Sequence, residues 1–186
     1  MVALASAAVA LGAAEAGRAS LRDAEARWFG AINGLGDRPF VPVWAMMQFG
    51  SLGGSLATGT AVAAAGHRRL GVRLAAVGTL AWLGSKAVKP FADRGRPAAV
   101  VTTAHVRGRE QAGLGYPSGH AAVAVGMAAA AAPHVASRLR APLWLAAVAA
   151  GAARMYVGAH LPLDVAGGVA LGVATERAVR VLRGPG

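Results

Sequence analysis

Long apolar runs separated by short polar segments constrain the fold of this chain more than any other feature. A helix that crosses a bilayer needs about 20 apolar residues. Hydrophobic residues make up 55% of the sequence and charged residues only 15%, a composition too apolar for an ordinary soluble domain. The runs that approach the required length are residues 2–16, 43–66, 70–91, 118–135, 142–157 and 162–182. The sequence therefore predicts an all-α integral membrane bundle of about six transmembrane helices.

The length of the chain and the character of its first run bear on its organisation. With 186 residues the chain is too short for more than one membrane domain, so we expect a single domain over residues 1–186. The first run is short, ends near Glu15 and has no basic segment before it. These features favour a retained or tilted first helix over a cleaved signal peptide, which is the alternative.

The net charge of +11 would suggest a nucleic-acid partner in a soluble protein. Here, most arginines lie at the edges of apolar runs or within three polar segments described below, so we predict membrane orientation and anion binding, and no nucleic acid. Basic clusters at residues 67–73, 138–140 and 177–183 would lie on the cytoplasmic side by the positive-inside rule. An even number of predicted crossings separates the three polar segments, which places them together on the opposite, extracytoplasmic face.

A short amphipathic segment connects the first two runs. Apolar residues recur at helical spacing over residues 21–35, which predicts a helix with one apolar face. We expect this helix to lie in the membrane interface with Trp28 and Phe29 in lipid. The alternative is a loop that packs on the bundle.

The first polar segment joins Lys89 at the end of a run to Arg96-Pro97 in the following loop. The lysine can act as a point charge and the arginine as a planar fork, so both can contact one anion near the membrane surface. Taken alone, a lysine and an arginine at a helix end are also typical interfacial anchors.

The second polar segment, Pro117-Ser118-Gly119-His120, stands directly before an apolar run. Ser118 is suited to the N-cap of a helix, and the free amides and positive dipole end of that helix favour a phosphate. Gly119 would let a ligand approach the backbone, and His120 could donate a proton to a leaving oxygen. A capped helix with an interfacial histidine is the simpler alternative.

The third polar segment contains Arg154, His160 and Asp164, with Pro162 suited to a first helical turn. Asp164 follows His160 by four residues, so its carboxylate could hold one ring nitrogen while the other attacks phosphorus. Charged residues at a membrane boundary are expensive and tend to be functional. The segment therefore favours a site over isolated surface residues.

In order and spacing, the three segments resemble a known signature. Lys-x6-Arg-Pro, Pro-Ser-Gly-His and Arg-x5-His-x3-Asp, between Lys89 and Asp164, are similar to the three-part motif of the type 2 phosphatidic acid phosphatase superfamily. The six-helix membrane members of that family fit the predicted runs. By this resemblance, phosphate oxygens would be bound by Lys89, Arg96, Ser118, Gly119 and Arg154.

The resemblance also implies the catalytic roles. His160 would be the nucleophile, Asp164 would orient it, and His120 would be the general acid that protonates the leaving group and then activates water. One position departs from the family pattern, because Ala153 stands where a serine often precedes the third-motif arginine. That change removes one expected hydrogen bond to phosphate and bears on affinity more than on mechanism.

Elimination of other phosphatase classes agrees with this interpretation. The chain has eight acidic residues spread along its length and no cysteine, which argues against a two-metal centre and a cysteine nucleophile. It has no Gly-x4-Gly-Lys-Ser/Thr loop for a nucleotide. We therefore expect no metal and no cofactor.

A site at the membrane face suits a phosphate or diphosphate on a long acyl or isoprenoid tail. Candidate substrates are a polyprenyl diphosphate such as undecaprenyl diphosphate, phosphatidylglycerophosphate and phosphatidic acid. Loop residues that could read the headgroup, or simply be solvated, are Arg94, His105, Arg107 and Arg109.

Two other functions fit parts of the sequence. One is an anion site like that of the vanadate-dependent haloperoxidases, which resemble this family but are larger and soluble. The other is a non-enzymatic lipid-binding membrane protein. The sequence makes no prediction of oligomeric state.

Overall fold

The computed structural model describes residues 2–17 and 21–183, and the regular structure in these ranges is entirely helical. The all-α fold class is thereby confirmed. The α-helices are α1 Val2–Ala16, α2 Asp23–Asn33, α3 Phe40–Met47, α4 Leu52–Ala64, α5 Arg68–Ala92, α6 Pro97–Val100, α7 Gly119–Ala131, α8 Ser137–Tyr156 and α9 Pro162–Arg183, and short 3-10 turns cover Gln48–Gly50 and Ala132–His134.

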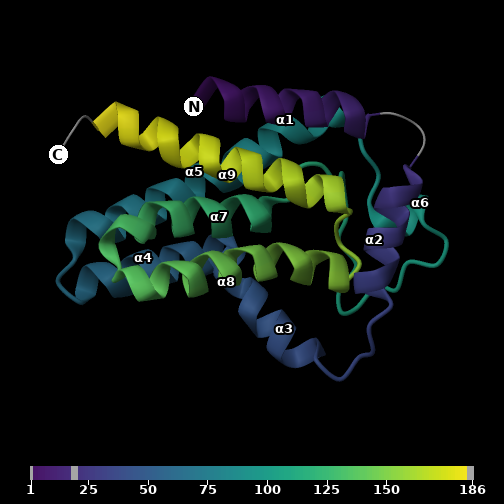
Figure 1. Ribbon diagram of the computed structural model, residues 1–186, viewed down its shortest axis with the longest axis horizontal. Coiled ribbons are helices and arrows are strands. Elements are labelled where there is room, and N and C mark those ends of the chain that lie inside the picture. Colours follow the sequence, from purple (N-terminus) through teal and green to yellow (C-terminus); the bar gives the residue numbers. More distant parts are fainter. Residues whose placement is uncertain (1, 18–20, 184–186) are drawn as a thin grey trace.

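Helix α7 lies at the centre of a bundle and packs against α5, α8 and α9. Helix α4 lies beside α5, and α1 covers α9. Helices α2, α3 and α6 are not part of the bundle itself and lie toward one of its ends (Figure 1). The contact between α7 and α9 is close because Gly168 has no side chain. A Cβ at Gly168 would lie 2.4 Å from the carbonyl oxygen of Ser118. This glycine therefore lets the start of α9 approach the start of α7, as small residues do where helices pack tightly.

The apolar run over residues 43–66 is two helices, which corrects the single helix expected there. Helix α3 ends at Met47, and Ser51 caps α4 by accepting a hydrogen bond from the Gly54 amide at 2.9 Å. Between them, Gly50 packs on α7, where a Cβ would lie 2.7 Å from the carbonyl oxygen of His120. A serine N-cap after a glycine ends one helix and starts another more strongly than the apolar run can extend it.

None of the helices in residues 2–17 and 21–183 is both long enough and apolar enough to cross a membrane. The count of about six crossings therefore stays a prediction.

Helix α2 forms where a short helix was predicted, but its apolar face is turned inward. Phe29 is only 1% exposed and packs against Met155 and Leu161, whereas Trp28 is 69% exposed. The expectation that Phe29 lies in lipid is therefore wrong. The burial of Phe29 anchors α2 to the end of the bundle and determines which polar residues of α2 reach that end.

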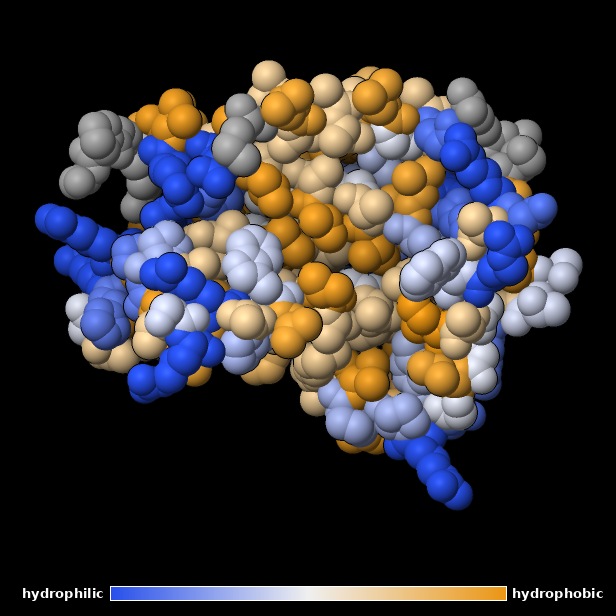
Figure 2. All heavy atoms as spheres, in the orientation of Figure 1, coloured by the Kyte–Doolittle hydropathy of each residue, from blue (hydrophilic) through white to orange (hydrophobic). Residues whose placement is uncertain are grey.

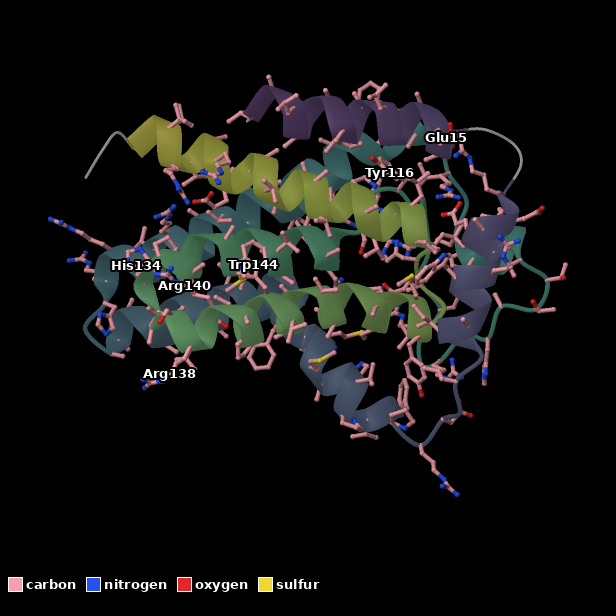
Figure 3. The ribbon with its side chains drawn as sticks, viewed as in Figure 1. Glu15, Tyr116, His134, Arg138, Arg140 and Trp144 are labelled. Carbon is pink, nitrogen blue, oxygen red and sulfur yellow. The ribbon has the colours of Figure 1, made fainter. Side chains whose placement is uncertain are left out.

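The loop before α7 is fixed by Tyr116, which lies between α1 and α9 (Figure 3). The Tyr116 side chain is fully buried, and its hydroxyl donates a hydrogen bond to the carbonyl oxygen of Val9 at 2.9 Å. Gly167 makes room for the ring, because a Cβ there would lie 2.3 Å from it. A well-packed tyrosine thus holds the backbone that leads into Ser118.

Candidate active site

The three polar segments meet at one end of the bundle. Helices α5 and α8 end there, while α7 and α9 begin there (Figure 1). Lys89 lies in the last turn of α5, His120 in the first turn of α7 and Arg154 in the last turn of α8. His160 lies in the loop between α8 and α9, and Asp164 lies in the first turn of α9.

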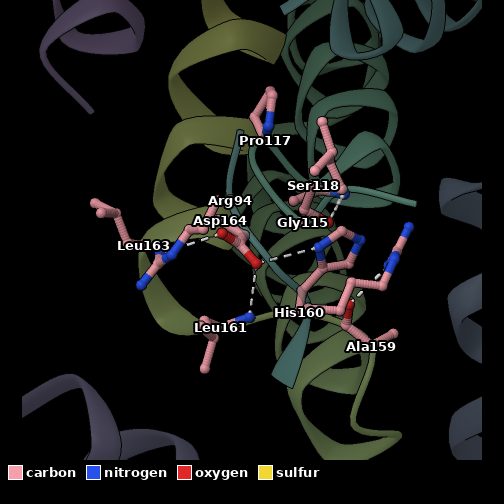
Figure 4. A network of polar contacts seen from close by, with 12 residues as sticks. Arg94, Gly115, Pro117, Ser118, Ala159, His160, Leu161, Leu163 and Asp164 are labelled. Carbon is pink, nitrogen blue, oxygen red and sulfur yellow. Dashed lines mark hydrogen bonds and ion pairs between the residues drawn. The ribbon is translucent and has the colours of Figure 1, made fainter. Parts of the chain in front are cut away.

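His160 and Asp164 form a buried pair (Figure 4). The Nδ1 atom of His160 lies 3.4 Å from Oδ2 of Asp164, somewhat longer than a well-formed hydrogen bond. The same Oδ2 accepts a hydrogen bond from the Leu161 amide at 2.9 Å, which fixes the carboxylate at the start of α9. This arrangement holds one ring nitrogen of His160 toward Asp164, as the spacing of the two residues predicted.

Burial lowers the pKa of the His160 imidazole to about 4, although the Asp164 carboxylate acts in the opposite direction. The imidazole is therefore neutral near pH 7. A neutral ring has a free lone pair, which is the form required of a nucleophile.

Arg154 is a buried cation, 4% exposed, beside this pair. Its Nη1 lies 3.4 Å from Sδ of Met47, and its Nε has no hydrogen-bond partner among the described residues. None of the ion pairs found in residues 2–17 and 21–183 includes Arg154. A buried guanidinium without a counter-charge is strongly unfavourable. Its chemistry therefore fits an anionic ligand.

The two first-segment cations contact backbone oxygens in this structure. The Nζ of Lys89 donates to the carbonyl oxygens of Leu114, Gly115 and Pro117 at 2.7, 2.9 and 3.2 Å. An ammonium group has three donors, so all of them hold the loop that precedes α7. Binding of phosphate by Lys89 stays a prediction and would require it to exchange at least one carbonyl.

Arg96 joins two loops of the site. Its Nε donates to the carbonyl oxygens of Ala112 and Gly113, and its Nη1 donates to that of Ala159 at 2.8 Å. The guanidinium therefore lies next to the backbone that carries His160. Binding of a phosphate by Arg96 stays a prediction.

The Pro117–His120 segment starts α7 as predicted. Ser118 is fully buried at the N-cap, and its Oγ accepts a hydrogen bond from the Ala121 amide at 3.5 Å. The Ser118 amide donates to the carbonyl oxygen of Asp164 at 2.8 Å, so this amide links α7 to α9. His120 lies within electrostatic reach of Arg96, Arg154 and His160.

Gly119 has a packing role at the same helix start. A Cβ on Gly119 would lie 2.8 Å from Oγ of Ser85 on α5. The residue was predicted to let a ligand approach the backbone, which stays a prediction, and the structure shows a close approach of α5. Any larger residue would push α7 away from the helix that carries Lys89.

Residues 69–184 match the family model described as the PAP2 superfamily. The chain belongs to this superfamily. It is therefore a phosphatase, a hydrolase of phosphoric esters, as the three motifs predicted. No curated protein shows a significant match to the sequence.

Two solved structures share the PAP2 fold of this chain. LpxE of Aquifex aeolicus superposes with a TM-score of 0.71 at 24% identity, over 81% of this chain and 90% of that one. The first transmembrane PAP2-type phosphatidylglycerolphosphate phosphatase from Bacillus subtilis superposes with a TM-score of 0.77 at 20% identity, over 98% of this chain and 95% of that one. At these identities, the likeness shows a common fold.

The candidate site has an extension that the sequence did not reveal. Arg94 donates from Nη1 to Oδ1 of Asp164 at 3.2 Å, and its two terminal nitrogens bind Glu25 of α2 at 3.0 and 2.6 Å (Figure 4 shows Arg94 beside Asp164). Glu25 also accepts a hydrogen bond from the Leu163 amide at 2.9 Å. Glu25, Arg94 and Asp164 thus form a chain of alternating charges that ends at the neutral His160 imidazole.

This extension corrects the expectation for Arg94. The residue was expected to be solvated or to contact a headgroup, but it is 8% exposed and pairs with Glu25 and Asp164. Arg107 is corrected in the same way. It is 8% exposed, bonds Asp37 at 2.6 Å and the carbonyl oxygen of Tyr156 at 2.6 Å, and lies over the Tyr156 ring. Both arginines are paired with carboxylates and hold loops to the bundle.

A small polar hollow of about 70 Å³ opens onto Arg154, with Arg109 and Gln111 in its lining. Arg109 is exposed, so its predicted contact with a headgroup stays open. No group of three or more His, Asp or Glu side chains in the described ranges lies close enough together to hold a metal ion.

The charge chain leads to a prediction for Glu25→Gln. The amide keeps the shape of the side chain but loses the charge that balances Arg94, so Arg94 should draw Asp164 out of line with His160. We expect kcat to fall about tenfold through this misalignment, with KM nearly unchanged because Glu25 does not contact the substrate. Steady-state kinetics would measure both constants.

Asp37→Asn is the matched control, because Asp37 also pairs with a buried arginine of a loop but not with Asp164. Its kcat should stay close to that of the wild type. Equal losses in both variants would show that Glu25 supports only the fold.

Proposed function

We propose that this phosphatase hydrolyses a phosphomonoester or diphosphate of a membrane lipid through a phosphohistidine intermediate, without a metal. The observation that carries the proposal is Arg154, a buried cation with an unpaired Nε beside a neutral imidazole. The structural likeness to a phosphatidylglycerolphosphate phosphatase supports a lipid phosphate as substrate. Candidates are phosphatidylglycerophosphate, phosphatidic acid and a polyprenyl diphosphate such as undecaprenyl diphosphate.

In the first step, the free ring nitrogen of His160 attacks phosphorus. The new N–P bond forms as the P–O bond to the lipid breaks, and His120 gives its proton to the departing oxygen. Asp164 keeps His160 oriented and stabilises the positive charge that develops on the ring. In the second step, His120 takes a proton from water as the water attacks phosphorus and releases His160.

The cations would neutralise charge on the transferred phosphoryl group, where electrostatic stabilisation contributes most to phosphoryl transfer. Arg154 and Arg96 would fill this role, and Lys89 could join them by exchanging a carbonyl contact. The free amides at the start of α7, beginning with Gly119, add hydrogen-bond donors and the positive end of a helix dipole. Ser118 would contribute by capping that helix.

The surface supports a membrane location. Hydrophobic residues cover the middle of the face seen in Figure 2, and hydrophilic residues gather at its two ends. Exposed apolar side chains of this extent are rare on soluble monomers, and they include Leu11, Leu145 and Leu182 at 73%, 69% and 84% exposure.

We place the site on the extracytoplasmic side of the cell membrane. The opposite end of the bundle carries His134, Arg138 and Arg140 (Figure 3), and the positive-inside rule makes that end cytoplasmic.

A membrane-impermeant thiol reagent applied from outside should then label a cysteine introduced at Gly95 but not one at Arg140.

The direct test of this function uses purified protein in detergent with EDTA and a panel of lipid phosphates. We expect release of inorganic phosphate from at least one of the three candidate classes. Absence of release from every member of the panel would contradict the proposal.

A further inference from the structure

A second and larger hollow, of about 270 Å³, lies inside the bundle away from the polar groups of the site. We call it the apolar hollow. Its walls come from α3 and the turn after it, α4, α5, α7 and α8, and Thr58 is the polar member of its lining. The residues used in the argument are Phe49, Ala124, Ala131, Leu143, Ala146 and Ala150.

The register of two helices connects the apolar hollow to the site. Ala124 follows His120 by one turn of α7, and Ala150 precedes Arg154 by one turn of α8. Residues four apart lie on the same face of a helix. The apolar hollow therefore begins one turn away from the proposed acid and the phosphate-binding arginine, on the faces that carry them.

From this start, the apolar hollow extends away from the site. Helix α7 leaves the site toward Ala131, and α8 approaches it from Leu143, so these two residues mark the far end. The rise of α7 from Ala124 to Ala131 is about 10 Å. A ligand whose phosphate lies at Arg154 could thus place a chain of that length between the helices.

The apolar hollow also opens sideways to the surface. Phe49 is 67% exposed and Ala146 is exposed, and both line it. Beside this opening, Leu145 and Val148 of α8 are 69% and 59% exposed. Apolar surface therefore continues from the outside of the bundle into the hollow, which suits entry of a hydrocarbon chain from lipid.

We propose that the apolar hollow binds the first part of one hydrocarbon tail of the substrate, and so selects phosphates that carry a long slim tail. This inference rests on the proposed function. At roughly 30 Å³ for each group, the share of one water molecule in the liquid, the hollow of about 270 Å³ holds about nine methylene-sized groups of a chain. That space accommodates a segment of a single chain rather than two chains side by side.

The test compares dodecyl phosphate with butyl phosphate in wild type and in Ala131→Leu, which fills the far end of the apolar hollow. Butyl phosphate is too short to reach Ala131, whereas the dodecyl chain should meet the new side chain. We expect the ratio of kcat/KM for dodecyl over butyl phosphate to fall roughly tenfold, as if about two methylene groups were returned to water. A loss of folding would lower both rates and leave the ratio unchanged.

Ala57→Leu is the matched control, because Ala57 is exposed on α4 next to Thr58 and does not line the hollow. Its ratio should equal that of the wild type. A wild-type ratio near one, or an unchanged ratio in Ala131→Leu, would overturn the tail site while leaving the phosphatase function intact. Failure of the wild type to hydrolyse any lipid phosphate would instead contradict the function on which the inference rests.

Discussion

Replacing His160 with alanine should lower the turnover of phosphate esters by about 10⁴-fold or more, the scale seen when a covalent nucleophile is removed. The imidazole is 3% exposed and neutral, and no other histidine is held by a carboxylate in the described ranges. Without it, neither the arginines nor His120 can form the bond to phosphorus. Initial rates of phosphate release in EDTA would measure the loss.

His134→Ala is the matched control, because His134 is exposed at the far end of the bundle (Figure 3). It should keep the wild-type rate.

Vanadate should inhibit the wild type, since it imitates five-coordinate phosphorus. Loss of wild-type activity in EDTA that a divalent ion restores would refute the metal-independent step.

Removal of His120 should have an effect that depends on the leaving group. General acid catalysis contributes about 10² to 10⁴ in rate, so His120→Ala should lose on this scale with a lipid phosphate, whose alkoxide leaves poorly. With an activated aryl phosphate, the oxygen leaves without a proton, and a loss of less than about tenfold is expected. The measurement is kcat/KM of the variant on both substrates, because kcat/KM reports the first step, whereas kcat also includes the hydrolysis of the intermediate that loss of His120 slows.

His160→Ala provides the comparison on the same pair of substrates. The bond to phosphorus is needed whichever group departs, so its loss should be equally severe with both. Rescue of His160→Ala by the aryl phosphate, without rescue of His120→Ala, would mean that the two roles are reversed.

Local sequence features were sufficient for most of the helices and for the pairing of His160 with Asp164. The N-cap at Ser118, the proline at position 162 and the spacing of His160 and Asp164 predicted the starts of α7 and α9 and the buried pair, because each depends on residues within about one turn. The same kind of signal was present at Gly50-Ser51, where it was outweighed by the apolar run and the break between α3 and α4 was missed.

Long-range contacts could not be predicted from local sequence features, for a physical reason. Glu25 pairs with Arg94 across 69 positions of sequence, and Met47 contacts Arg154 across 107. No local period relates such residues, since their meeting depends on how α2 and α3 pack on the end of the bundle. The inward turn of Phe29 decides that packing, and the apolar spacing of its helix fits a lipid-facing or a protein-facing surface equally well.

The central claim, a phosphoryl group carried by His160, is tested most directly in the His120→Ala variant with an activated aryl phosphate. The first step should proceed there, while hydrolysis of the intermediate should be slow because His120 no longer activates water. Quenching in alkali, which preserves phosphohistidine, followed by peptide mass spectrometry should then find the phosphoryl group on His160. A phosphoryl group on another residue, or continued turnover with no covalent phosphate at any time, would contradict the account.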